Sequence, residues 1–197
     1  QSSASIVNVL LASSANIYGN TVEGVLNESM PANPANDYAV SKYAMEIMAN
    51  LWRDKLPITI ARPFNYTGIG QDEKFLIPKI VSHFKRRKPV IELGNLDVWR
   101  EFNDVRFVAN AYSMLLATPP YSSQNINICT GNAYSLGEVI NLCEKITGHR
   151  LDINVNPNFV RDNDVRMLKG DNTLLRSIVG DTNTYELEET LKWMMAS

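Results

Sequence analysis

The stretch that decides the fold is Asn36-Asp37-Tyr38-Ala39-Val40-Ser41-Lys42-Tyr43-Ala44-Met45-Glu46. It opens a helix and places Tyr38 and Lys42 four positions apart, so both side chains lie on one helical face. A Tyr phenol ordinarily has a pKa near ~10, and a nearby ammonium group lowers that value by favouring the phenolate. Such a Tyr can donate a proton to a carbonyl oxygen or accept one from a hydroxyl. The competing interpretation is a surface Tyr beside a surface Lys, because this spacing often occurs by chance.

Two apolar runs flank this helix, and each ends in polar residues. Residues 7–12 are mostly Val and Leu and lead into Ser13 and Ser14, whereas residues 58–64 lead into Asn65. Continuous apolar runs of this length predict buried parallel strands. Ligands bind at the carboxyl ends of the strands in open α/β sheets, so we expect these polar side chains to face a binding site.

The order of these motifs resembles the extended short-chain dehydrogenase/reductase family, which includes the nucleotide-sugar epimerases, dehydratases and reductases. A strand with Ser14 is followed by a helix with Tyr38 and Lys42 and then by a strand with Asn65, and the resemblance continues to about Met194. It implies an α/β fold, namely the carboxyl-terminal part of a Rossmann-type doubly wound parallel sheet with a small α/β substrate-binding lobe.

The resemblance also implies how the chain is divided, as a single incomplete unit without separate domains. The second half of the NAD(P)-binding Rossmann domain is expected over residues 1–71 and 104–131. The nucleotide-sugar-binding lobe is expected over residues 72–103 and 132–197.

Roles follow from the resemblance residue by residue. Tyr38 is the acid/base, Lys42 tunes it and holds the nicotinamide ribose, and Ser14 hydrogen-bonds the reacting sugar oxygen, as a hydroxyl that both donates and accepts can. The cofactor is NADP or NAD, and it performs the hydride step. The resemblance assigns Ser13 and Pro63, with Tyr38 and Lys42, to the cofactor, and Asn16, Asn65, Lys79, Arg100, Arg161 and Asp164 to the nucleotide sugar. No residue is assigned to a metal.

Two arginines resemble the family's contacts to the substrate's phosphates. Trp99-Arg100-Glu101-Phe102 resembles an Arg-acidic-aromatic turn whose Arg makes charge-assisted bonds to the diphosphate. The alternative is a surface Arg100 paired with Glu101. Arg161 and Asp164 resemble a late pair that contacts the phosphate and ribose, and the alternative for them is a structural salt bridge.

Asn16 discriminates among the activities of the family. The 4,6-dehydratases carry an acidic residue two positions after the strand-end hydroxyl, and an amide cannot act as an acid or base near neutral pH. Dehydration is therefore disfavoured. Residues 94–102, the Arg161–Asp164 pair and residues 187–191 look most like GDP-4-keto-6-deoxymannose reductases. A nucleotide-sugar 4-epimerase is the second hypothesis, and a non-catalytic nucleotide-sugar-binding relative is the third.

Composition limits the other classes of function. The chain has 197 residues, of which 45% are hydrophobic, and its net charge of −2 implies no strong attraction to nucleic acid or membrane. No apolar run is long enough to span a bilayer, and the first residues are polar, unlike a secretory signal. Cys129 and Cys143 lie in apolar contexts, which is typical of reduced core cysteines in a cytoplasmic protein.

The chain contains no Gly-rich strand–turn–helix motif, which in the family precedes all of these motifs and holds the cofactor pyrophosphate. We therefore expect a longer enzyme whose amino-terminal part is absent here, and a fragment that is inactive alone. The Tyr38–Asp54 helix carries an apolar stripe that we expect to lie in the core; the corresponding helix of the family pairs with its twin, which predicts a homodimer. The stripe consists of Ala44, Ile47, Met48, Leu51 and Trp52.

Overall fold

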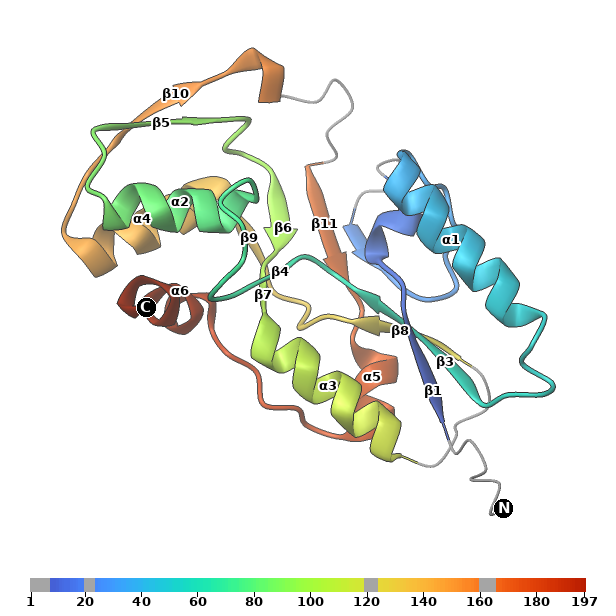
Figure 1. Cartoon of the computed structure of the whole chain (residues 1–197). Coiled ribbons are helices and arrows are strands. Elements are labelled where there is room, and N and C mark those ends of the chain that lie inside the picture. The colour runs from blue at the N-terminus through green and yellow to red at the C-terminus, as the bar shows by residue number, and fades with distance from the viewer. Residues whose placement is uncertain (1–7, 20–23, 119–123, 160–165) are drawn as a thin grey trace.

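A three-stranded parallel sheet forms the centre of the computed structural model, which describes residues 8–19, 24–118, 124–159 and 166–197 (Figure 1). Its strands are β1 (Val9–Ala12), β3 (Ile58–Pro63) and β8 (Asn125–Ile128), in the order β1-β3-β8. Val9 lies opposite Ile58, and Ile60 lies opposite Asn125. The two strands predicted around the Tyr38 helix are therefore confirmed as parallel neighbours.

Helices cover both faces of this sheet. On one face, Ala49 of α1 (Asp37–Asn50) packs against Ile58 and Ile60. On the other face lie α3 (Val105–Ala117) and α5 (Thr173–Val179). Their side chains Phe107 and Leu175 pack in one cluster with Ala61, which belongs to β3 like Ile58 and Ile60. Successive residues of a strand point to opposite faces, so both faces of β3 are covered. This layering confirms the doubly wound α/β class.

A second core lies beside the sheet, where three helices pack together with a pair of parallel strands (Figure 1). The helices are α2 (Leu76–Lys85), α4 (Leu136–Thr147) and α6 (Leu187–Ala196), and the strands are β5 (Val90–Leu93) and β10 (Asp152–Val155). Their shared core includes Phe84, Val139 and Leu191.

Short strands join these two parts. A four-stranded sheet has the order β2-β11-β6-β9, and β4 pairs with β7. The sequence patterns did not predict these six strands, because strands of two to four residues are too short to show a period of two. They are β2 (Gly24–Leu26), β4 (Tyr66–Thr67), β6 (Trp99–Glu101), β7 (Asn103–Asp104), β9 (Ala133–Ser135) and β11 (Met167–Gly170); the 3-10 turns are η1 (Ala15–Tyr18) and η2 (Pro157–Phe159).

The ends of α3 and α4 follow local capping rules. Asp104 caps α3 by accepting a hydrogen bond from the Arg106 amide at 2.7 Å. Ser135 and Glu138 form a capping box at the start of α4, and Gly148 ends that helix in the left-handed region at a φ of 60°. These local rules hold because each involves residues within about one helical turn.

The placement predicted for the apolar stripe of α1 is wrong. Its large side chains are exposed, with exposed fractions of 50% for Ile47, 65% for Met48, 77% for Leu51 and 51% for Trp52, and Ala44 is exposed as well. The helix turns a different face toward the sheet, and that face carries Ala39, Glu46 and Ala49. The periodicity of the stripe was real, but it marks the outer surface of this chain.

Two further observations concern the class of protein. Cys129 and Cys143 are buried free thiols, as predicted. Among the parts of the chain that the structure describes, no helix combines the length and the apolar character needed to cross a bilayer.

Candidate functional site

The carboxyl end of β1 carries the two serines that the sequence singled out. Ser13 and Ser14 are both buried. Ser14 is the N-cap of η1, and its Oγ accepts a hydrogen bond from the Asn16 amide at 3.2 Å. That bond uses the oxygen as an acceptor, so the hydroxyl proton stays available to donate to a ligand.

The helix α1 brings Lys42 to the same strand end. Asn36 caps the helix by accepting a hydrogen bond from the Ala39 amide at 2.9 Å, which places Tyr38 in the first turn. Lys42 Nζ donates to the Ala12 carbonyl at 2.9 Å and lies 5.7 Å from the centroid of the Tyr38 ring. Tyr38 is 52% exposed. The structure therefore presents an ammonium group and an open phenol beside the end of β1.

A buried ion pair lies beneath this site. Glu46, one turn after Lys42 on α1, has an exposed fraction of only 2%. Its Oε1 accepts from Ser13 Oγ at 2.5 Å and from Arg62 Nε at 3.0 Å, and its Oε2 accepts from Arg62 Nη2 at 2.7 Å. Arg62 belongs to β3, so one carboxylate joins the helix to two strands.

The network continues from Arg62 to the third strand. Arg62 Nη1 donates to the Tyr18 hydroxyl at 2.9 Å, and that hydroxyl donates to Asn127 Oδ1 at 2.7 Å. Burial alone would lower the pKa of Arg62, but hydrogen bonds and charge from Glu46 and Tyr18 raise it above its ordinary value. Burial raises the pKa of Tyr18. Both partners of Arg62 therefore keep the guanidinium charged.

The sequence motifs did not predict this network, although one signal was present. Arg62 interrupts the apolar run of β3, and a charged side chain inside a buried strand requires a partner of opposite charge. Glu46 follows Lys42 by four residues, a spacing that is more commonly an exposed pair on a helix surface. Which carboxylate met Arg62 was decided by the packing of α1 on the sheet.

The other residues assigned near the strand ends occupy varied environments. Pro63 is buried at the end of β3 opposite Ile128. Asn65 lies two residues after Pro63 and is exposed, and its backbone carbonyl accepts hydrogen bonds from both the amide and the side chain of Asn103. Asn16 is exposed in η1. Asn16 and Asn65 are therefore accessible from the carboxyl edge of the sheet.

Arg100 and Glu101 point in different directions along β6. Arg100 Nη1 donates to the Trp99 carbonyl at 2.8 Å. Glu101 is only 1% exposed, and its carboxylate accepts from the Gly170 amide at 2.5 Å and from the Thr130 amide at 3.0 Å. Burial raises the pKa of Glu101 even though these amides stabilise its charge. Glu101 thus joins β6 to β11 and to the loop after β8.

Lys79 lies in the second core region, on α2. Its Nζ donates to the Glu92 carbonyl at 2.7 Å and lies 4.8 Å from the centroid of the Phe159 ring. Phe159 is the last described residue before a gap, and Arg161 and Asp164 fall outside the described residues. Their assigned roles stay predictions.

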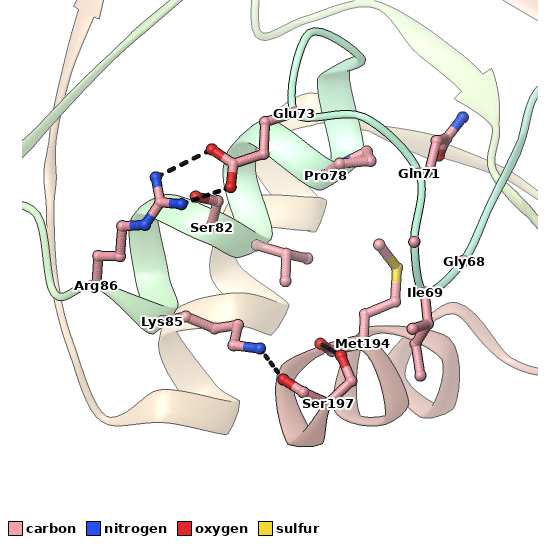
Figure 2. Close-up of a pocket in the computed structure, with 12 residues that line it drawn as sticks. Gly68, Ile69, Gln71, Glu73, Pro78, Ser82, Lys85, Arg86, Met194 and Ser197 are labelled. Carbon is pink, nitrogen blue, oxygen red and sulfur yellow. Dashed lines mark hydrogen bonds and ion pairs between the residues drawn. The ribbon is translucent and has the colours of Figure 1, made fainter.

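A cavity of about 390 Å³ lies between α2 and α6, and Figure 2 shows the side chains around it. Arg86 on its rim forms a two-pronged ion pair with Glu73 at 2.6 and 3.0 Å, and Lys85 donates to the Ser197 carbonyl. Lys85 and Arg86 at the end of α2 therefore have partners within the chain. The cavity is separate from the Tyr38 site, because its lining comes from α2, α6 and the loop after β4.

Comparison with known proteins bears on this geometry. A family model described as GDP-mannose 4,6 dehydratase matches residues 2–194. The chain belongs to this family. The family assignment confirms the resemblance to nucleotide-sugar epimerases, dehydratases and reductases that the Ser-Tyr-Lys pattern indicated.

Two curated relatives act, by their names, on GDP-linked 6-deoxy sugars. The GDP-6-deoxy-D-talose 4-dehydrogenase of Aggregatibacter actinomycetemcomitans is 38% identical over 89% of this chain, and the GDP-6-deoxy-D-mannose reductase of Pseudomonas aeruginosa is 32% identical over 93%. The matched region spans 59% and 62% of the length of these relatives.

Two solved structures have folds that closely match the fold of this chain. A putative epimerase from Burkholderia cenocepacia J2315 is 52% identical with a TM-score of 0.94, covering 96% of this chain and 62% of that one. RMD from Pseudomonas aeruginosa, solved in complex with NADPH, is 28% identical with a TM-score of 0.88, covering 96% of this chain and 65% of that one.

Proposed function

We propose that the protein carrying this chain reduces the C4 keto group of a GDP-4-keto-6-deoxyhexose, with NADPH or NADH as the hydride donor and Tyr38 as the proton donor. The observation that carries the proposal is the position of Lys42. Its ammonium is bonded to the carbonyl of Ala12, next to Ser13 and Ser14, and lies one helical turn from the exposed Tyr38 phenol.

The residues at this edge suit a nicotinamide cofactor. The Ala12 carbonyl takes one of the three N–H donors of the Lys42 ammonium, which keeps donors for ribose hydroxyls. Ser13 and Pro63 close the floor of the site from β1 and β3, where both are buried. A bound reduced nicotinamide would supply the hydride, and its relation to this chain is supported by the NADPH complex of RMD.

The protein groups then supply the proton and hold the sugar. The hydride forms a C–H bond at C4 as the C=O double bond opens, and Tyr38 O–H gives its proton to the resulting oxygen, so the ketone becomes a secondary alcohol and the cofactor is oxidised. Ser14 keeps its proton and donates a hydrogen bond to the same sugar oxygen. Lys42 stabilises the phenolate left on Tyr38 until solvent replaces the proton.

We assign binding of the substrate's nucleotide to the part of the chain outside the cofactor-binding half. We propose that residues 1–71 and 104–131 hold the cofactor and that residues 72–103 and 132–197 hold the nucleotide sugar. Arg100 and Lys79 would bind the phosphates as cations, and Asn65 would donate to them from the strand end. Arg161, Asp164 and Asn16 complete the proposed set.

The two curated relatives leave the product's configuration open. D-Talose and D-mannose differ only at C4, so a 4-dehydrogenase and a reductase with these names act on opposite configurations of the same carbon. Asn16 disfavours the third reaction of the family, since an amide cannot supply the acid or base that dehydration needs. Both relatives are named for a redox reaction of a GDP-linked 6-deoxyhexose, which supports a redox step for this chain.

The test uses the complete protein with GDP-4-keto-6-deoxymannose and NADPH or NADH. Net loss of reduced cofactor with formation of a GDP-6-deoxyhexose supports the proposal, and NMR of the product assigns its C4 configuration. Inversion of a nucleotide sugar without net cofactor change would establish a 4-epimerase instead. Binding of nucleotide sugar without turnover would favour a non-catalytic relative.

Tyr38→Phe separates chemistry from binding. Removing a positioned proton donor should lower kcat by ~10²–10⁴. Tyr43→Phe is the matched control, because Tyr43 lies on the same helix but off the face that Tyr38 and Lys42 share. Near-normal turnover in Tyr38→Phe would refute the assigned role.

A further inference from the structure

We infer that Glu46 is a positioning residue for catalysis, holding α1 at the end of β1 so that Tyr38 and Lys42 meet the strand-end serines. The inference rests on the proposed function, because it takes Tyr38, Lys42 and Ser14 as the reacting groups. Its geometric basis is independent of that function. Glu46 is a carboxylate with 2% exposure on the covered face of α1, between the small residues Ala39 and Ala49.

The contacts of Glu46 converge on the segments that carry the three reacting groups. Ser13 Oγ, 2.5 Å from Oε1, is the neighbour of Ser14 on β1. Lys42 lies one helical turn before Glu46, and Tyr38 lies two turns before it. A single carboxylate therefore ties the helix bearing the acid/base pair directly to the residue adjoining Ser14.

Arg62 makes this connection rigid. It binds both oxygens of Glu46, at 3.0 and 2.7 Å, and a guanidinium held in this forked arrangement fixes the orientation of the carboxylate. The same Arg62 reaches Tyr18, whose hydroxyl binds Asn127 of β8. The anchor thus extends across all three strands of the parallel sheet.

The apolar contacts of α1 come from few side chains. Ala49 lies in the cluster that includes Ile58 and Ile60, and Tyr43 packs against the cluster that includes Ile17. Small apolar contacts permit sliding, whereas a forked ion pair does not. Two further charged groups lie in this region: Arg53, which binds Asn125, and Glu28, which accepts from the Asn127 amide at 2.9 Å.

The kinetic test is Glu46→Gln in the complete protein. The amide has the shape of the carboxylate but presents an N–H group where Arg62 or Ser13 needs an acceptor, so the helix should shift. A shift of this kind lowers kcat, and we expect a loss of about 10- to 100-fold. KM for the nucleotide sugar should change by less than about threefold, because its phosphate contacts lie elsewhere.

Two more variants make the result specific. Ala49→Gly is the control for general weakening of the helix, because it removes helix propensity and an apolar contact on the same element without touching the ion pair. It should leave kcat within about threefold of wild type. Glu46→Asp retains the charge but draws it back by roughly 1.5 Å, and should give an intermediate kcat. This variant also tests the inference if Glu46→Gln fails to fold.

A second readout does not depend on any reaction. Hydrogen exchange of the free protein, followed by mass spectrometry, should accelerate in Glu46→Gln within both residues 8–14 and residues 37–46. In Ala49→Gly the change should be confined to the helix. If the wild-type protein reduces no ketone, the proposed function fails. The exchange result still tests whether Glu46 holds α1 against β1.

The outcomes separate cleanly. Lower kcat in Glu46→Gln, partial recovery in Glu46→Asp and coupled exchange in both segments support the inference. Wild-type kcat in a folded Glu46→Gln or Glu46→Asp protein would overturn it. An equal loss in Ala49→Gly, or a rise in KM with unchanged kcat, would reduce Glu46 to an ordinary structural residue.

Discussion

Replacing Arg62 with Met gives the most quantitative test of how this structure is held together. The guanidinium is almost fully buried, with side-chain exposures of 5% for Arg62 and 2% for Glu46. Met retains much of the side chain's volume but none of its donors. Glu46 would then keep its hydrogen bond from Ser13, but its buried charge would lose the cation that is paired with it.

The size of the effect follows from this geometry. Breaking a buried ion pair by removing one partner typically costs about 3–5 kcal/mol, because an uncompensated charge is left behind. Domains are stable by only about 5–15 kcal/mol, so this is a large fraction. With a urea dependence of about 2 kcal/mol per molar, the unfolding midpoint should fall by roughly 2 M.

The assay is urea unfolding of wild type, Arg62→Met, Glu46→Leu and the double variant. The double variant removes both charges, and replacing a buried pair by apolar groups is often nearly neutral. We therefore expect the double variant to lose less free energy of unfolding than the sum of the two single-variant losses. The difference, the coupling energy, should be at least about 2 kcal/mol.

An exposed pair provides the matched control. Arg86 and Glu73 form a similar two-pronged contact, but their side chains are 58% and 53% exposed. Arg86→Met should therefore leave the unfolding midpoint nearly unchanged. If Arg62→Met behaved like Arg86→Met, or if the double variant were simply additive, the reasoning about burial would be wrong.

The remaining predictions concern the site, the core and the surface. Lys42→Met should weaken cofactor binding and lower kcat together, which cofactor titration and steady-state kinetics would detect. Arg100→Ala should mainly raise KM for the nucleotide sugar, and a loss confined to kcat would contradict its assigned role. Burial raises the pKa of Asp104, but hydrogen bonds from Arg106 and Thr190 outweigh it and lower the pKa below its ordinary value. The stability from this carboxylate is thus present above an unfolded pKa of ~3.9 and is lost as the pH falls through the lower folded value, so Asp104→Asn should cost less at low pH in thermal melts. Leu51→Glu should convert the predicted homodimer to a monomer in light scattering, and an unchanged mass would remove α1 as the interface.

Sequence patterns located the functional helix and its neighbours because the signals are local. The N-cap at Asn36 and the capping box at Ser135 each involve residues within four positions. Tyr38 and Lys42 share a face by helical geometry alone. The apolar strands around them required only continuous hydrophobic runs.

Other features depended on segments that are distant in sequence. The short strands β2 and β11 pair in parallel across most of the chain, from Leu26 to Gly170, and neither carries enough residues to show a period. Glu101 is buried because amides from two remote loops meet its carboxylate. A sequence pattern does not reveal which loops arrive there.

By itself, the sequence determined the α/β class, the helix carrying Tyr38 and Lys42, and the polar ends of β1 and β3. Tertiary packing decided which face of α1 is covered, exposing Leu51 and burying Glu46. Both faces of a helix can show a regular pattern, and the sheet selects the one whose side chains complement it. Here Arg62 of the sheet is a buried charge that needs a counter-charge, and the covered face of α1 supplies it as Glu46.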